Sequence, residues 1–315
     1  MGERQLGLFL RAPPSAVPDR DADEELSARL SPRLLLGPST WTFPGWEGIV
    51  YPRGLSREDL IERGLSFASR HPLFRTVGID RSHYAPLEED ELRRYASELE
   101  PGYPCVIKAW NVLGALEDRQ GRENPNFFDA RLCEERVILP LARAFAGHVG
   151  ALVFQLAPIN ERSLPHPEAF AARLDGFLGA LPTAFRYAVE LRNRELFTGA
   201  YLEVLARHRA AHVLNLWTHM PPLGKQLAVP GVLSAPFVVC RLSIPPGERY
   251  EEQKARFAPF DRIVQPDERM RADVVALAKA CLQAKKTLYL TVNNKAEGSS
   301  PLTIRALIER LAGLA

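Results

Sequence analysis

Short apolar runs alternate with longer amphipathic stretches along most of this chain. The candidate strands are apolar throughout and lie at 34–37, 76–80, 105–109, 151–155, 187–191, 212–216, 237–242 and 287–292. Between most of them, apolar residues follow helical spacing, at 87–99, 127–145, 167–181, 199–208, 267–284 and 301–311. Strands without a polar face that alternate with helices are typical of a parallel sheet covered on both sides.

Eight such units in roughly 280 residues predict an α/β fold, a single TIM (β/α)8-type barrel. A doubly wound open sheet is the alternative, but no GxGxxG follows the first strand and the chain has no P-loop. Ser56 and Asp59 form a capping-box-like pattern, which predicts the start of one further helix.

Residues 1–32 differ from the rest of the chain. Pro13, Pro14 and Pro18 precede an acidic stretch at 19–25. This composition predicts a flexible N-terminal extension, with or without a short helix, ahead of a barrel that covers 33–315. The apolar segment 6–10 is expected either to dock on the barrel or a partner, or to be disordered.

Composition and charge exclude several classes of protein. The chain is 46% hydrophobic and 25% charged, with a formal net charge of +2, so global charge favours neither nucleic acid nor membrane. No apolar run approaches a membrane span, and the N-terminus lacks a signal-peptide core. The cysteines, Cys105, Cys133, Cys240 and Cys281, show no CxxC spacing, and the position of Cys105, Cys240 and Cys281 in or beside apolar runs predicts buried thiols. We therefore expect a cytoplasmic protein without a membrane partner.

A TIM barrel carries its functional residues at the C-terminal ends of its strands. Nearly every predicted strand ends in a charged, amide or aromatic residue: Trp41, Asp80, Lys108, Gln155, Glu190, Arg192, Arg241, Asn293 and Asn294. Burying charges is costly unless they are paired, so these residues predict a functional site. The alternative is a paired or solvated network that only closes the top of the barrel.

Several motifs at these strand ends also occur together in one known family. They are Gly37-Pro-Ser-Thr-Trp41 followed by Trp46, Gly48 and Tyr51-Pro52, then Val77-Gly-Ile-Asp-Arg-Ser-His-Tyr84, Phe154-Gln-Leu-Ala-Pro158, Val189-Glu-Leu-Arg192, Cys240-Arg-Leu and Asn293-Asn294. Because these motifs occur in this order, the chain resembles the DUF72 family, also called YecE-like, of bacterial and archaeal proteins of unknown function. The resemblance implies a TIM barrel.

The chain departs from the family pattern at several positions, so it resembles a divergent member. The glutamate of the family's second strand is Gly78 here, its asparagine is Asp80 and its phenylalanine is His83. The His-Gly pair after the late-strand arginine is Ser243-Ile244. The resemblance therefore implies functional roles only at positions where this chain keeps the residue of the family pattern.

The strand-end residues suggest an enzyme that acts by acid/base chemistry on a small phosphorylated or carboxylated substrate. Glu190 is the candidate general acid or base, with a structural salt bridge to Arg192 or Arg241 as the alternative. Lys108 and Asp80 complete the catalytic candidates, and Lys108 is expected to bind an anion or form an ion pair rather than a Schiff base. The candidate substrate-binding residues are Trp41, Tyr84, Gln155, Arg192, Arg241, Asn293 and Asn294.

Two other functions stay open. The same face could bind nucleic acid, as a binding protein or a phosphodiesterase-like enzyme, with its basic patch widened by Arg192, Arg194, Lys225, Arg249, Lys254 and Arg256. It could also be a non-catalytic binding barrel. We expect no cofactor and no metal, because a site built from His83, His219, Asp80 and Glu190 would be sparse and no HxH or HExxH motif occurs.

Overall fold

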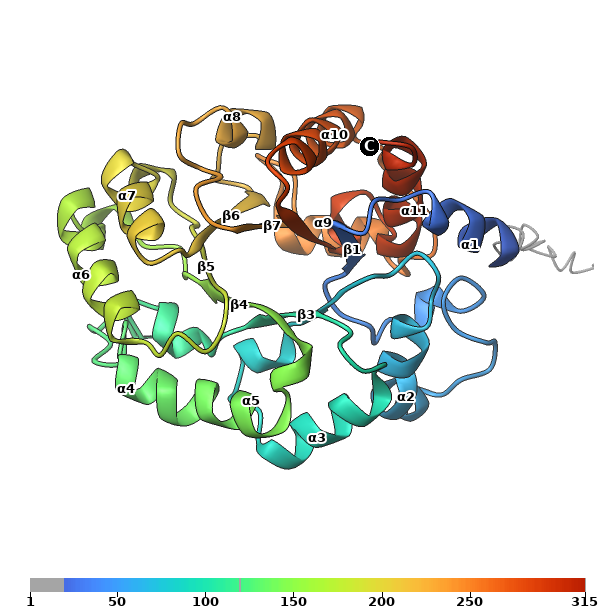
Figure 1. Ribbon diagram of the computed structural model, residues 1–315, viewed down its shortest axis with the longest axis horizontal. Coiled ribbons are helices and arrows are strands. Elements are labelled where there is room, and N and C mark those ends of the chain that lie inside the picture. Colours follow the sequence, from blue (N-terminus) through green and yellow to red (C-terminus); the bar gives the residue numbers. More distant parts are fainter. Residues whose placement is uncertain (1–19, 119, 315) are drawn as a thin grey trace, which may run out of the picture.

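Eight parallel strands form the centre of the computed structural model, which describes residues 20–118 and 120–314 (Figure 1). They neighbour one another in the order β1-β8-β7-β6-β5-β4-β3-β2, and each hydrogen-bonded pair is parallel. The predicted TIM-type barrel and all its predicted strands are confirmed. The strands are β1 (Leu34–Pro38), β2 (Val77–Ile79), β3 (Cys105–Lys108), β4 (Val149–Gln155), β5 (Tyr187–Glu190), β6 (Ala211–Leu216), β7 (Phe237–Leu242) and β8 (Thr287–Val292).

The barrel closes where β1 meets β2, and glycine is required there. A Cβ on Gly37 would lie 1.7 Å from the carbonyl oxygen of Thr76, and a Cβ on Gly78 would lie 2.6 Å from that of Ser39. Both contacts are with backbone, which cannot move aside as a side chain can. Gly78, like Gly37, therefore serves the close approach of the two strands.

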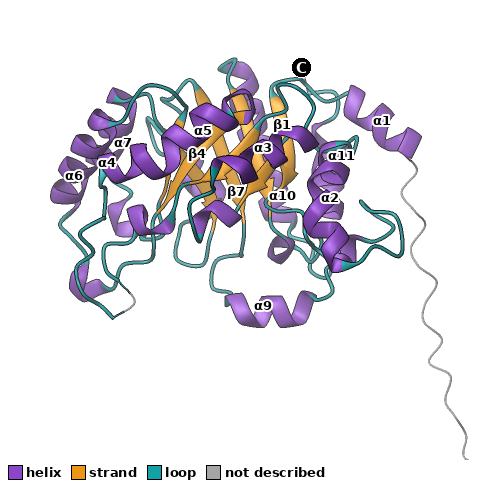
Figure 2. Cartoon of the chain, turned by 90° about the horizontal axis from the view of Figure 1, so that it is seen from below, coloured by secondary structure: helices purple, strands orange, loops and turns teal. Residues whose placement is uncertain are grey.

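Helices surround the strands, and the predicted helical stretches are confirmed (Figure 2). They are α2 (Arg57–Ser69), α3 (Glu89–Glu98), α4 (Ala130–Cys133), α5 (Leu139–Ala144), α6 (Pro167–Ala180), α7 (Gly199–Arg207), α10 (Glu268–Gln283) and α11 (Ser300–Leu311). The stretch at 127–145 is not one regular helix, because a π-helical turn at Glu134–Ile138 separates α4 from α5. Pro140, at the start of α5, has no backbone N–H to donate to the preceding turn.

Two short helices were not predicted from the sequence. They are α8 (Leu223–Leu227) and α9 (Tyr250–Phe257), and in Figure 2 α9 stands away from the strands at the end of two loops. Helices of this length show too few apolar repeats for a periodicity to be recognised. The capping box at Ser56 is confirmed, since its Oγ accepts from the N–H of Asp59 at 3.0 Å and Asp59 accepts from the N–H of Ser56 at 2.9 Å.

Part of the expected N-terminal extension packs on the barrel. Helix α1 (Arg20–Ala28) lies beside α11, with Asp23 buried and paired to Arg305. Leu30 is also buried in the main core. Residues 20–32 thus pack on the folded body, whereas residues 1–19, including segment 6–10, lie outside the described part.

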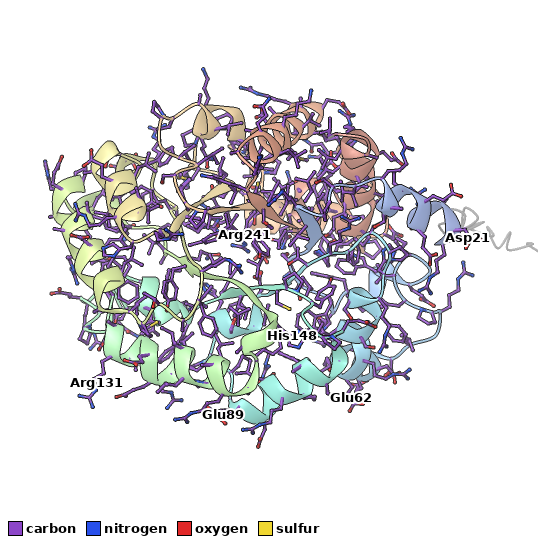
Figure 3. The ribbon with its side chains drawn as sticks, in the orientation of Figure 1. Asp21, Glu62, Glu89, Arg131, His148 and Arg241 are labelled. Carbon is purple, nitrogen blue, oxygen red and sulfur yellow. The ribbon has the colours of Figure 1, made fainter. Side chains whose placement is uncertain are left out.

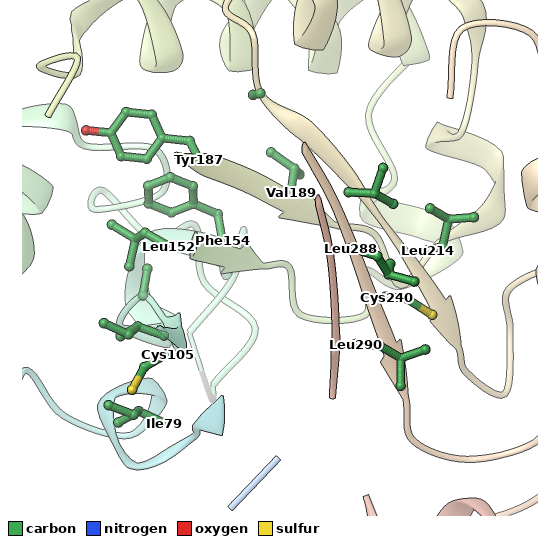
Figure 4. Packing of buried hydrophobic residues seen from close by; sticks show 14 of the residues in the cluster. Ile79, Cys105, Leu152, Phe154, Tyr187, Val189, Leu214, Cys240, Leu288 and Leu290 are labelled. Atoms are coloured by element: carbon green, nitrogen blue, oxygen red, sulfur yellow. The ribbon is translucent and has the colours of Figure 1, made fainter. Parts of the chain in front are cut away.

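Two apolar layers fill the structure, one inside the barrel and one between the strands and the helices. Val106, Val153 and Ala188 belong to the inner layer. Phe154 and Val189, their immediate neighbours in the chain, belong to the outer one (Figure 4). Because both faces of each strand are buried, the strands are apolar throughout.

The cysteines are free and buried, as predicted. No helix in residues 20–118 and 120–314 is long and apolar enough to cross a membrane.

Candidate functional site

The inner face of the barrel turns from apolar to polar at the C-terminal ends of the strands. Side chains two residues apart share a face, so each inner apolar residue predicts the direction of the residue two positions later. By this rule the inner-layer residues Val106, Val153, Ala188 and Val239 are followed on the same face by Lys108, Gln155, Glu190 and Arg241. In Figure 3, Arg241 lies near the middle of the barrel.

Glu190 is the centre of a buried ion-pair network. Its carboxylate is fully buried, lies 2.5 Å from Nη2 of Arg192 and accepts a hydrogen bond from Nη1 of Arg241. Arg241 also donates to Oε1 of Gln155 at 3.0 Å and lies 3.5 Å from Asp80. Asp80 in turn pairs with Nζ of Lys108 at 3.0 Å. Five strand ends, from β2, β3, β4, β5 and β7, thus meet in one network.

The charges of this network stabilise one another. Burial alone would raise the pKa of Glu190, but the charges of Arg192, Arg241 and Lys108 outweigh it and lower that pKa to about 2. Burial lowers the pKa of Arg192 to about 10, which leaves it protonated at neutral pH. Glu190 is therefore a carboxylate and both arginines are cations under physiological conditions.

Lys108 within the network and Lys295 beside it have pKa values close to the physiological range. Burial and the charge of Arg241 lower the pKa of Lys108 to about 8, although Asp80 opposes this shift. Burial lowers the pKa of Lys295 to about 8 as well. His83 is neutral, because burial and the charge of Lys108 lower its pKa to about 4.

These groups line a pocket of about 170 Å³, here called the anion pocket. Lys108, Arg192, Arg241 and Lys295 bring four positive charges to it. Asp80 in its wall and Glu190 beside Arg192 and Arg241 bring two negative charges. The pocket therefore has an excess of two positive charges. Its remaining lining is neutral, from His83, Tyr84, Gln155, Trp217, Ser243, Ile244, Tyr250 and Asn293.

The structure brings most of the predicted site residues together but places two of them elsewhere. Trp41 is 5% exposed and packs edge-on against Tyr95 in the core, so it offers no free face to the anion pocket. Asn294 points away from the barrel interior and accepts a hydrogen bond from the indole of Trp46 at 3.1 Å. The predicted residues that do meet are Asp80, Tyr84, Lys108, Gln155, Glu190, Arg192, Arg241 and Asn293.

Three aromatic or charged residues of the anion pocket, Trp217, Tyr250 and Lys295, were missed in the sequence. Trp217 follows β6 directly, so the strand-end rule could have found it. Lys295 comes two residues after Asn293. The Nζ of Lys295 lies 3.3 Å from Oδ1 of Asn293 and 4.1 Å from the ring centre of Tyr250. No local pattern indicates that Lys295 and Tyr250 meet, because they come from different βα-loops.

The histidines and carboxylates do not form a metal-binding cluster within the described residues. No group of three or more His, Cys, Asp and Glu side chains there could hold an ion. His83 contacts Gln155 at 3.5 Å, whereas His219 lies in a separate groove with Thr218 and Met220.

Comparisons with known proteins agree with this fold. The family model described as "Protein of unknown function DUF72" matches residues 35–314. A DUF72 family protein from Enterococcus faecalis has 12% sequence identity and a TM-score of 0.57, with 90% of this chain and 96% of that chain covered. One from Thermotoga maritima has 14% identity and a TM-score of 0.58, with 88% and 98% covered. These structures share the fold, and no curated protein matches the sequence.

Proposed function

The chain belongs to the DUF72 family, and we propose that it binds a small phosphorylated or carboxylated molecule in the anion pocket and transfers a proton to or from it. One observation carries this proposal. The pocket has two more positive than negative charges, all held at the C-terminal ends of barrel strands. Buried cations in excess of their counter-ions are costly, and a bound anion would remove that cost.

Lys295 and the two arginines suit the binding role. Within the described residues Lys295 takes part in no ion pair, since its Nζ contacts the amide oxygen of Asn293 and faces the rings of Tyr250 and Phe260. Glu190 and Gln155 accept hydrogen bonds from Arg241 and fix the orientation of its planar guanidinium, so its direction toward a bound anion is set in advance. Fixed donors bind an oxyanion without the cost of ordering them first.

Lys108 suits the proton transfer better than Glu190 does. A general acid or base works best when its pKa lies near the operating pH, and that of Lys108 is about 8. Glu190, at about 2, is too weak a base near neutral pH. The salt bridge that the sequence left open as an alternative is therefore the favoured role for Glu190, which orients Arg192 and Arg241.

A ligand screen followed by a turnover assay tests this function. Phosphorylated and carboxylated metabolites are screened by thermal shift, and each hit is incubated with the protein and followed by NMR. Lys108→Met should abolish turnover and weaken anion binding without abolishing it, whereas Lys279→Met, on the exposed face of α10, should change neither. If no anion of either class stabilises the protein, the binding proposal is wrong. If Lys108→Met retains full turnover, the proton-transfer role is wrong.

Two exposed tyrosines support nucleic-acid binding as a second candidate function. Tyr84 is 76% exposed and Tyr250 47% exposed, and both line the anion pocket, where they could stack on bases. Binding of single-stranded oligonucleotides with a steep salt dependence would support this candidate. If the protein is a non-catalytic binding barrel, an anion will stabilise it in the thermal-shift screen and NMR will show no turnover.

A further inference from the structure

A second and larger hollow lies next to the anion pocket. This outer groove has a volume of about 780 Å³, against about 170 Å³ for the pocket. Its walls come from the loops that follow β4, β5, β6 and β7, so it lies on the same face of the barrel. Arg192 lines both hollows. The pocket alone is smaller than the roughly 300–1,000 Å³ usual for sites that bind a whole small molecule.

The outer groove differs from the pocket in charge. Its two arginines, Arg192 and Arg194, are matched by two carboxylates, Glu161 and Glu195, and Arg194 pairs with Glu195 at 3.3 Å. A second phosphate would therefore find no excess positive charge there. A neutral group with hydroxyls fits better, because charged and neutral donors and acceptors line the groove beside apolar proline rings.

Arg192, which lines both hollows, is covered by Trp217, which lines the anion pocket. The guanidinium carbon of Arg192 lies 3.7 Å from the ring centre of Trp217. Arg192 is 4% exposed, and although its Nη2 pairs with Glu190, its Nε and Nη1 have no hydrogen-bond partner. The indole N–H of Trp217 also has none. Buried donors without acceptors are costly, and an oxygen supplied from outside the protein would satisfy them.

We propose that the anion pocket and the outer groove are two subsites for one ligand, a sugar monophosphate. Its phosphate occupies the pocket and its neutral, hydroxyl-rich body occupies the groove. An oxygen between the two accepts from the unpartnered N–H groups of Arg192, and the ring of Trp217 moves aside to expose them. The inference rests on the proposed function, because it assigns the substrate class of the same site.

Binding measurements with the full chain test the proposal. Ribose 5-phosphate, inorganic phosphate and ribose are titrated separately by calorimetry. Two added hydrogen bonds of ordinary strength predict that ribose 5-phosphate binds about tenfold more tightly than inorganic phosphate. Asn160→Trp, which fills the groove, should remove that advantage and leave the affinity for inorganic phosphate unchanged. Arg162→Trp, two residues along the same loop and outside the groove, should retain it.

The indole of Trp217 provides a second readout. Ribose 5-phosphate should change the tryptophan fluorescence of the wild type, and Trp217→Phe should abolish most of that change. If inorganic phosphate binds but ribose 5-phosphate binds no more tightly, the two-subsite proposal is wrong and the proposed anion binding stands. If neither binds, the sugar monophosphate proposal is wrong, and the proposed function is then decided by the carboxylated metabolites of the thermal-shift screen. An oligonucleotide that binds more tightly than ribose 5-phosphate would also overturn the sugar monophosphate assignment.

Discussion

Replacing Glu190 with glutamine should destabilise the fold without weakening anion binding. The substitution removes a fully buried negative charge that pairs with Arg192 and Arg241. It leaves two buried guanidinium groups with one counter-ion fewer. Breaking a buried ion pair from one side costs about 3–5 kcal/mol. The phosphate affinity should stay the same or rise, because the site becomes more positive.

The lowered pKa of Glu190 gives a second value for the stability that this carboxylate contributes, and it predicts how that stability depends on pH. Its fall from 4.5 to about 2 on folding corresponds to a stabilisation of about 3 kcal/mol. Because folding lowers this pKa, the stabilisation is complete above pH 4.5 and is lost as the pH falls toward 2. The wild type and Glu190→Gln should therefore differ most near pH 7 and converge in acid.

Urea unfolding of both proteins between pH 7 and pH 3 measures this difference, and phosphate titration at pH 7 measures binding. Glu297→Gln is the matched control, because Glu297 is also fully buried and pairs with Arg271 at 2.8 Å, outside the site. It should lose similar stability and keep wild-type phosphate binding. A Glu190→Gln variant within about 0.5 kcal/mol of the wild type at pH 7 would refute the ion-pair reasoning. Lost phosphate binding in a folded variant would show that Glu190 has a direct role.

Three further predictions follow from the same contacts. Arg241→Lys should weaken phosphate binding about tenfold, because a single ammonium cannot replace a planar guanidinium whose Nη1 donates to Glu190 and Gln155 while its Nη2 faces Asp80; equal affinity by calorimetry would contradict this. Sulfate, whose charge is constant between pH 7 and 9, should bind less tightly as the pH rises through about 8, where Lys108 and Lys295 lose their protons. The double variant Lys108→Met/Lys295→Met should bind sulfate weakly and without that pH dependence, and a flat wild-type profile would refute the assignment. Gly78→Ala should cost about 1–3 kcal/mol in urea unfolding, because its Cβ would press on the backbone of Ser39, whereas Gly147→Ala, with open space around it, should cost much less; equal stabilities would show that β1 and β2 can separate.

The strands and the direction of their polar ends were predictable because both depend on local spacing. Apolar runs alternating with helices specify the barrel, and the two-residue period of a strand directs Lys108, Gln155, Glu190 and Arg241 inward. The same period explains why Asn294, one residue after Asn293, lies outside the site.

The folded state of residues 20–32 and the helices α8 and α9 were not predictable in the same way. The acidic residues at 19–25 suggest an extension, yet Asp23 is buried because Arg305, far away in the chain, pairs with it. That ion pair depends on the packing of α11 beside α1, which no local sequence pattern shows.

The sequence by itself determined the barrel, the family resemblance and the set of charged residues at the strand ends, because periodicity and residue type are local properties. Only the tertiary structure decided which charges neutralise one another. It paired Glu190 with two arginines and Asp80 with Lys108, left Lys295 with Asn293 and Tyr250, and buried Trp41 against Tyr95. The physical reason is that ion pairing and burial depend on distances between strands and loops that are far apart in the chain.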